Sequence, residues 1–167
     1  LSQNNTVLSS LKLDHNKLGP AGAKAFAAKN VFTTSVINDK FGRPCDVLIH
    51  YPRGLTDLDL STNDFGDEGA KYVADIIKQN SILTKLDVSC NSIGSSGLKD
   101  IGAAMPYNSV LGSLILRNNT FLNQGVNDFV QKAGCINVTD LDLSGNRLTE
   151  GVGSSLVTLS LSSTSIL

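Results

Sequence analysis

Two histidines and three cysteines are the residues best suited to nucleophilic or metal chemistry, and their spacing limits what they can do. His50 follows Cys45 by five residues, and a Cys–His pair is one way to generate a reactive thiolate. We interpret this pair as incidental. His15 occupies an ordinary turn position after the first predicted strand. No cluster of His, Cys and acidic residues has metal-ligand spacing, so the sequence predicts no metal site.

Cofactor and nucleotide chemistry is not indicated either. The sequence contains no P-loop and no dinucleotide fingerprint, and its recurring glycines stand about 28 residues apart. Aromatic residues make up 5% of the chain and Trp is absent, which gives little support for stacking on bases or sugars. We therefore expect no cofactor, no small-molecule substrate and no enzymatic activity.

Length and composition favour a single globular domain over residues 1–167. The chain is 41% hydrophobic and 17% charged, with a net charge of -1, so it can bury a core. The near-neutral charge argues against nucleic-acid binding. No apolar run approaches the roughly 20 residues that span a bilayer. The sequence begins in mid-pattern at Leu1, and we expect it to be part of a longer protein.

The cysteine count is odd, which favours free thiols in a reducing compartment over a disulfide framework. We therefore predict a cytoplasmic protein. The three cysteines are Cys45, Cys90 and Cys135. Three Asn-x-Ser/Thr sequons offer the alternative of a secreted glycoprotein, but we interpret them as coincidence in a chain rich in Asn, Ser and Thr. The sequons begin at Asn4, Asn118 and Asn137.

An internal repeat is the main signal in this sequence. The pattern L-x-x-L-x-L-x-x-N-x-L, with conservative exchanges, occurs five times, and the last four copies follow one another at 28, 28 and 27 residues. The copies begin at Leu8, Leu55, Leu83, Leu111 and Val138. We expect a degenerate copy to begin at Thr33 and a partial copy to begin near Leu156.

Each copy predicts a strand, a turn, a helix and a return loop. The L-x-L core alternates as a short strand does, and the Asn follows where the chain leaves that strand. A buried amide there can bond the backbone of neighbouring turns, which predicts a ladder. Its members are Asn16, Asn63, Asn91, Asn119 and Asn146. Helical apolar stripes then follow, such as Val73, Ile76 and Ile77. Strands pack more closely than helices, so the stack curves with the strands inside.

The sequence resembles the leucine-rich repeat proteins of the ribonuclease-inhibitor-like subclass. The segments LTDLDLSTNDFGDEGAKYVADIIKQN from Leu55 and LTKLDVSCNSIGSSGLKDIGAAM from Leu83 carry the resemblance most clearly. It implies an α/β leucine-rich-repeat solenoid, with parallel strands on a concave face and helices on a convex face. It also implies a protein that binds other proteins, usually inside the cell.

Charges are distributed unevenly between the two predicted faces. The outward strand positions hold five acids and two bases, whereas the predicted helices carry lysines such as Lys24, Lys71 and Lys99. We predict that a protein partner, and specifically a basic patch on it, binds the concave face. The predicted contact residues are Lys12, Asp57, Asp59, Lys85, Asp87, Ile115, Arg117, Asp140 and Asp142. The alternative is that Asp is simply common at these positions in such repeats.

Two other functions remain open at this point. Ran GTPase-activating proteins resemble this subclass, and an arginine supplied in trans can stabilise the transition state of GTP hydrolysis. The chain has four arginines, of which only Arg117 ends a predicted strand; the others are Arg43, Arg53 and Arg147. The second alternative is a structural spacer within a larger receptor or scaffold.

Overall fold

Six parallel strands form one sheet in this protein. The computed structural model describes residues 8–28, 35–38, 44–47, 55–134, 137–153 and 165–166. The strands lie in the order β1-β4-β5-β6-β7-β8. Their bounds are β1 (Ser10–Lys12), β4 (Asp57–Asp59), β5 (Lys85–Asp87), β6 (Ser113–Ile115), β7 (Asp140–Asp142) and β8 (Ser165–Ile166).

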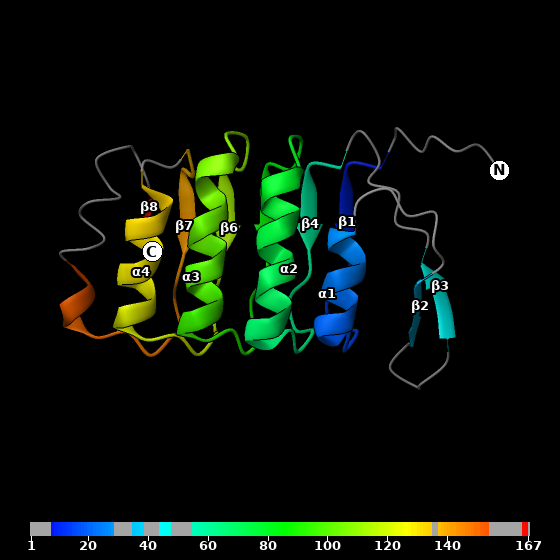
Figure 1. Cartoon of the computed structure of the whole chain (residues 1–167), viewed down its shortest axis with the longest axis horizontal. Coiled ribbons are helices and arrows are strands. Elements are labelled where there is room, and N and C mark those ends of the chain that lie inside the picture. Colours follow the sequence, from blue (N-terminus) through cyan, green and yellow to red (C-terminus); the bar gives the residue numbers. More distant parts are fainter. Residues whose placement is uncertain are drawn as a thin grey trace.

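Four α-helices lie side by side on one face of this sheet (Figure 1). They are α1 (Gly19–Ala27), α2 (Gly66–Gln79), α3 (Ser95–Ala104) and α4 (Asn123–Ala133). Short 3₁₀ helices follow α3 as η1 (Met105–Tyr107) and β7 as η2 (Glu150–Val152). The regular alternation of strand and helix makes the chain an α/β solenoid, as the repeat predicts.

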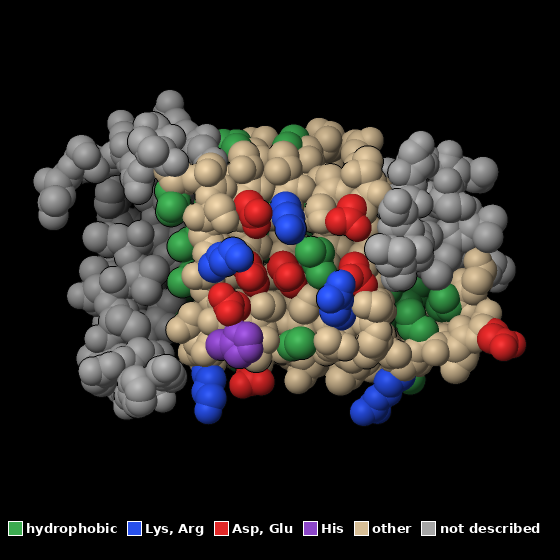
Figure 2. Space-filling view, turned by 180° about the vertical axis from the view of Figure 1, so that it is seen from behind, with side chains coloured by type: hydrophobic (Ala, Val, Ile, Leu, Met, Phe, Trp, Pro, Cys, Tyr) green, Lys and Arg blue, Asp and Glu red, His purple; other side chains and the backbone are tan. Residues whose placement is uncertain are grey.

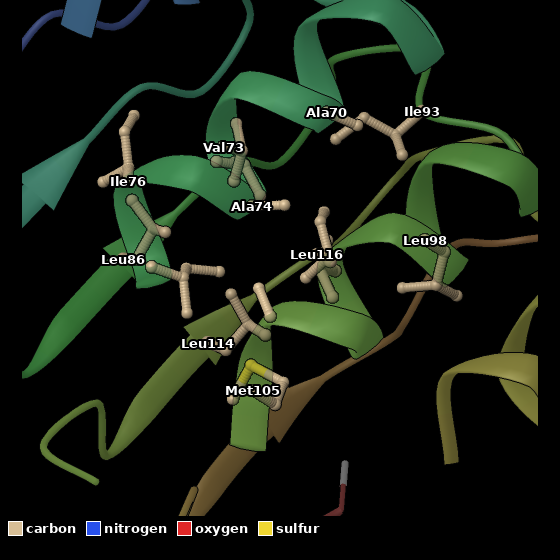
Figure 3. Close-up of a cluster of buried hydrophobic side chains, with 14 of the residues drawn as sticks. Ala70, Val73, Ala74, Ile76, Leu86, Ile93, Leu98, Met105, Leu114 and Leu116 are labelled. Carbon is tan, nitrogen blue, oxygen red and sulfur yellow. The ribbon is translucent and has the colours of Figure 1, made fainter. Parts of the chain in front are cut away.

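The core fills the space between the strands and the helices. The central leucines of four strands are each at most 1% exposed: Leu58, Leu86, Leu114 and Leu141. Figure 3 shows Leu86 and Leu114 of the sheet in one cluster with Val73, Ile76 and Met105 of the helical layer. Because each unit offers only one apolar face on each layer, the stack as a whole supplies the core.

The predicted degenerate unit at Thr33 is wrong, because β1 pairs directly with β4 and leaves no place for a strand between them. The described parts of this segment are β2 (Ser35–Asn38) and β3 (Pro44–Val47), which pair with each other in antiparallel fashion. The hairpin lies beyond β1 and α1 at one end of the solenoid (Figure 1). Phe41 replaces the ladder asparagine here, so this segment lacks the amide that would bond neighbouring turns.

The last copy also departs from its predicted register. The strand beside β7 is β8, which pairs Leu141 with Ile166. The partial repeat predicted Leu159 and Leu161 for this strand, and both lie outside the described residues. The register prediction is wrong because a copy that follows Val138 by only 18 residues leaves too little chain for a turn, a helix and a return loop.

Asparagine side chains connect the turns that leave the strands. Asn91 shows the arrangement: its Nδ2 donates to the carbonyls of Leu60, Val88 and Ser89, and its Oδ1 accepts from the amide N–H of Asn63 at 2.9 Å. Three bonds of this second kind run along the stack, from the amides of Asn16, Asn63 and Asn91 to the Oδ1 atoms of Asn63, Asn91 and Asn119.

The ladder stops before Asn146. Its Nδ2 donates to the carbonyls of Leu116, Leu143 and Ser144, but its Oδ1 is buried without a hydrogen-bond partner. In the first three units both residues that flank the ladder asparagine have positive φ, whereas beside Asn119 only Asn118 does. Thr120 follows Asn119, and its backbone N–H donates to the carbonyl of Ile93 at 2.9 Å, so the turn takes another path here.

Candidate functional site

The face of the sheet opposite the helices, here called the strand face, carries two rows of side chains. They flank the buried central leucines and come into register across neighbouring strands. The first row is Ser10, Asp57, Lys85, Ser113 and Asp140, and the second is Lys12, Asp59, Asp87, Ile115 and Asp142. Figure 2 shows this face, with acidic and basic side chains interspersed over its middle. The nine predicted contact residues therefore lie on one surface, with Arg117 just past the end of β6.

Over β6 and β7 the strand face satisfies its own polar groups. Arg117 Nε donates to Asp142 Oδ2 at 3.0 Å, and Nη2 donates to the same oxygen. Ser113 Oγ lies 2.8 Å from Asp140 Oδ2. Burial alone would raise the pKa of Asp142, but hydrogen bonds from Ser144 and Arg117 outweigh it and lower that pKa below its ordinary value. The hydrogen bond to Asp142 raises the pKa of Arg117.

Three of the strand-face acids also hold the turns that follow them. Oδ1 of Asp59, Asp87 and Asp142 accepts from the backbone N–H of the serine two residues later, at 2.9–3.0 Å. Those serines are Ser61, Ser89 and Ser144. This is the side-chain-to-backbone bonding of an Asx turn. The repeated Asp-x-Ser therefore has a structural reason of its own, and the sequence carries that signal three times.

Over β4 and β5 the strand-face charges lack partners. Among the described residues, the side chains of Asp57, Lys85 and the neighbouring Lys12 of β1 make no hydrogen bond or ion pair, and the carboxylates of Asp59 and Asp87 use only Oδ1. Asp57 pairs in register with Lys85, and Asp59 with Asp87. Two carboxylates therefore stand as neighbours on adjacent strands, about 4.8 Å apart at the backbone.

The other residues considered for chemistry are dispersed. His15 Nδ1 lies 2.8 Å from Asp14 Oδ2, and this hydrogen bond lowers the pKa of that carboxyl. Cys90 is a free, exposed thiol, and Arg147 is exposed. The side chains of Cys45, His50, Arg43 and Arg53 fall outside the part of the chain that the structure describes. Within that part, no group of three His, Cys, Asp or Glu side chains is arranged to hold a metal ion.

A second set of cross-unit bonds was not predicted from the sequence. Asp67 Oδ1 accepts from the backbone N–H of Gly94 at 2.7 Å, Ser95 Oγ accepts from that of Leu122, and Asn123 Oδ1 accepts from that of Thr149. Each donor lies where the outer segment of the next unit begins, so each side chain caps the following unit. The signal was a polar residue four positions after Asn63, Asn91 and Asn119.

Family models match most of the units that the structure contains. One described as Leucine Rich repeat matches residues 4–27, 53–74 and 79–102, and another described as Leucine Rich Repeat matches residues 137–159. Together the matches cover more than half of the chain and include β1, β4, β5 and β7. No curated protein matches the sequence. Among the described helices, none has the length and apolar character needed to cross a membrane.

Proposed function

This chain belongs to the leucine-rich repeat proteins, and from that premise we propose that its strand face binds a protein partner. Family members generally mediate protein–protein interaction. The ribonuclease-inhibitor-like subclass is part of the proposal, supported by the four α-helices of the outer layer and by units of 27–28 residues. A cytoplasmic location is also part of it, supported by the free thiol of Cys90.

One observation carries the proposal: the strand face is an uninterrupted array of outward side chains in register across five strands. The helices cover the opposite face (Figure 1), so they leave this one open to a partner. Side chains held on a sheet are positioned more rigidly than side chains on loops. Such a surface suits recognition of a folded protein or of an extended segment.

The partner surface that we propose is basic. The two rows hold five acids against Lys12 and Lys85. The ion pair between the adjoining Arg117 and Asp142 removes one of these acids, which leaves four acids against two bases. A net negative surface attracts a positive one and speeds their encounter at low ionic strength.

A matched pair of triple variants tests the proposal by capture from cytosolic extract. The strand-face variant combines Ser10→Lys, Asp57→Lys and Ile115→Lys, three residues whose side chains make no hydrogen bond among the described residues. The helix-face control makes the same changes of charge on α2, α3 and α4, as Ser96→Lys, Asp75→Lys and Gln131→Lys. We expect a protein captured by the parent chain to be retained by the control and lost by the strand-face variant. Loss only with the helix-face variant would refute the proposal.

No observation favours GTPase activation as a second function. The bonds to Asp142 hold the Arg117 side chain against the sheet, and an arginine that acts in trans must reach the partner's phosphates. If this chain stimulated the hydrolysis of GTP by the captured protein, that result would support GTPase activation.

A further inference from the structure

At one end of the strand face the acidic side chains have hydrogen-bond or ion-pair partners within the molecule, and at the other end they have fewer. This difference bears on where a partner binds most tightly. The inference rests on the proposed function. Over β6 and β7, Asp140 and Asp142 already have a donor within the molecule. Over β4 and β5, neither Asp59 nor Asp87 has an ion-pair partner among the described residues, and one oxygen of each carboxylate has no hydrogen bond.

Asp59 and Asp87 form an incomplete polar centre. They face each other across adjacent strands in register, and like charges in that position repel each other. Their Oδ1 atoms accept the turn bonds from Ser61 and Ser89, which leaves the Oδ2 atom of each carboxylate for another donor. Ser89 is only 7% exposed, and its hydroxyl oxygen is buried without a hydrogen-bond partner. A cation with several donors, placed between the two carboxylates, would relieve the repulsion and use the free oxygens.

The neighbouring residue adds an apolar contact. Ile115 is in register with Asp87 on the next strand and is half-buried amid polar side chains. Its partner on the far side is Asp142, which Arg117 neutralises. Along the second row a lysine, Lys12, is in register with Asp59. The two carboxylates follow, then an apolar side chain, then a neutralised pair. A long side chain with a charged head and a partly apolar stem fits this order.

We propose that Asp59 and Asp87 form the anchor for an arginine side chain of the partner protein, and that an apolar residue beside that arginine packs on Ile115. The planar guanidinium presents its donors as a fork, which can bridge two carboxylates at once. Lysine offers only a point charge to the same pair, so arginine binds more tightly than lysine here.

Titration with short peptides, followed by NMR of the whole chain, tests the anchor without the natural partner. The probe is a capped tripeptide of arginine, leucine and arginine, and its counterparts replace arginine by lysine or by glutamate. We expect saturable shifts centred on the signals of Asp59, Asp87 and Ile115. The arginine peptide should bind more tightly than the lysine peptide, and the glutamate peptide should not bind. Shifts spread evenly over both faces, shifts centred on Asp140, or no shifts at all would overturn the proposal.

Conservative variants separate charge from structure. In Asp59→Asn/Asp87→Asn, each amide oxygen still accepts the turn bond from Ser61 or Ser89, so the fold is kept while both charges are removed. We expect the arginine peptide to bind this variant about tenfold more weakly or worse. The control Asp75→Asn/Asp100→Asn removes the same charge from the helices and should bind as the parent does. Equal affinity for the two variants would contradict the anchor.

The captured partner then distinguishes this proposal from the one on which it rests. If the partner is lost by the strand-face triple variant but binds Asp59→Asn/Asp87→Asn as tightly as the parent chain, the strand face binds and the anchor is wrong. If the triple variant binds normally, the proposed function itself fails.

Discussion

The amide N–H of Asn91 donates to Oδ1 of Asn119 at 3.0 Å, whereas no such bond joins Asn119 to Asn146. The side-chain amide of Asn91 is fully buried, with five hydrogen bonds to its own unit and to the preceding one. At Asn146 the oxygen is unpartnered and only the nitrogen is engaged. The same residue type therefore holds the stack to different degrees along its length.

Replacing these asparagines by alanine should destabilise the protein unequally. We expect Asn91→Ala to lower the free energy of unfolding by about 3 kcal/mol or more, because it leaves several buried backbone groups unpaired. Asn146→Ala should cost about 1–2 kcal/mol, since it removes donors but no satisfied acceptor. Urea unfolding at neutral pH measures both values. Equal losses would mean that the bonds through Oδ1 contribute nothing to stability.

The ion pair between Arg117 and Asp142 predicts a dependence of stability on pH. Because the pKa of Asp142 in the folded state lies below its ordinary value, the pair contributes fully above the unfolded pKa of about 3.9 and is lost as the pH falls through the folded pKa. Asp142→Asn keeps an oxygen for the amide of Ser144 but loses the pair. We therefore expect the variant to be less stable than the parent at pH 7 and to approach it near pH 2.

Unfolding by urea at several pH values checks this, with Asp57→Asn as the control because the Asp57 side chain makes no hydrogen bond or ion pair among the described residues. The control curve should follow that of the parent at every pH. If the difference in the free energy of unfolding between the parent and Asp142→Asn stays constant from pH 7 to pH 2, the pair does not titrate in this way.

The repeat frame predicted the strands β1 and β4 to β7, the helices and the ladder from Asn16 to Asn119, because each depends on residues close together in one unit. Leu86 and Leu114 are buried because alternation alone points them inward. The bond between Arg117 and Asp142 was not predicted, since it depends on the register between two units and on the rotamer of a long side chain. Asp59 and Asp87 were predicted to lie on the acidic strand face, but the sequence does not show which acidic side chains lack an ion-pair partner.

The hairpin of β2 and β3 escaped prediction for a different reason. The gap between the copies at Leu8 and Leu55 was divided as if every segment had to add a strand to the sheet. An inserted segment can instead leave the stack and pair with itself. In the segment beginning at Thr33, Phe41 stands where the other copies have the ladder asparagine.

At Gly102, α3 and α4 lie so close together that there is no room for a side chain. A Cβ atom at this position would lie 2.8 Å from Cα and 2.9 Å from the carbonyl oxygen of Phe129. An exposed helical Gly→Ala change usually stabilises a protein by up to about 1 kcal/mol. At Gly102 the sign should reverse, with a loss of about 1–3 kcal/mol, because the two helices must move apart. Thermal unfolding measures the change in stability. Gly153→Ala, where a Cβ would meet no atom of the described residues within 4 Å, should be close to neutral.

Asp67 on α2 caps the beginning of α3, and this contact between units can be tested by itself. Its Oδ1 accepts from the amides of Gly94 and Gly97, at 2.7 and 3.0 Å. Asp67→Ala should lower the free energy of unfolding by about 1–2 kcal/mol, because two amides at the start of α3 lose their acceptor. Asp67→Asn keeps an oxygen in place and should recover most of that loss. If alanine and asparagine cost the same, the negative charge at the start of α2 matters more than the cap, because the helix dipole favours an acid there.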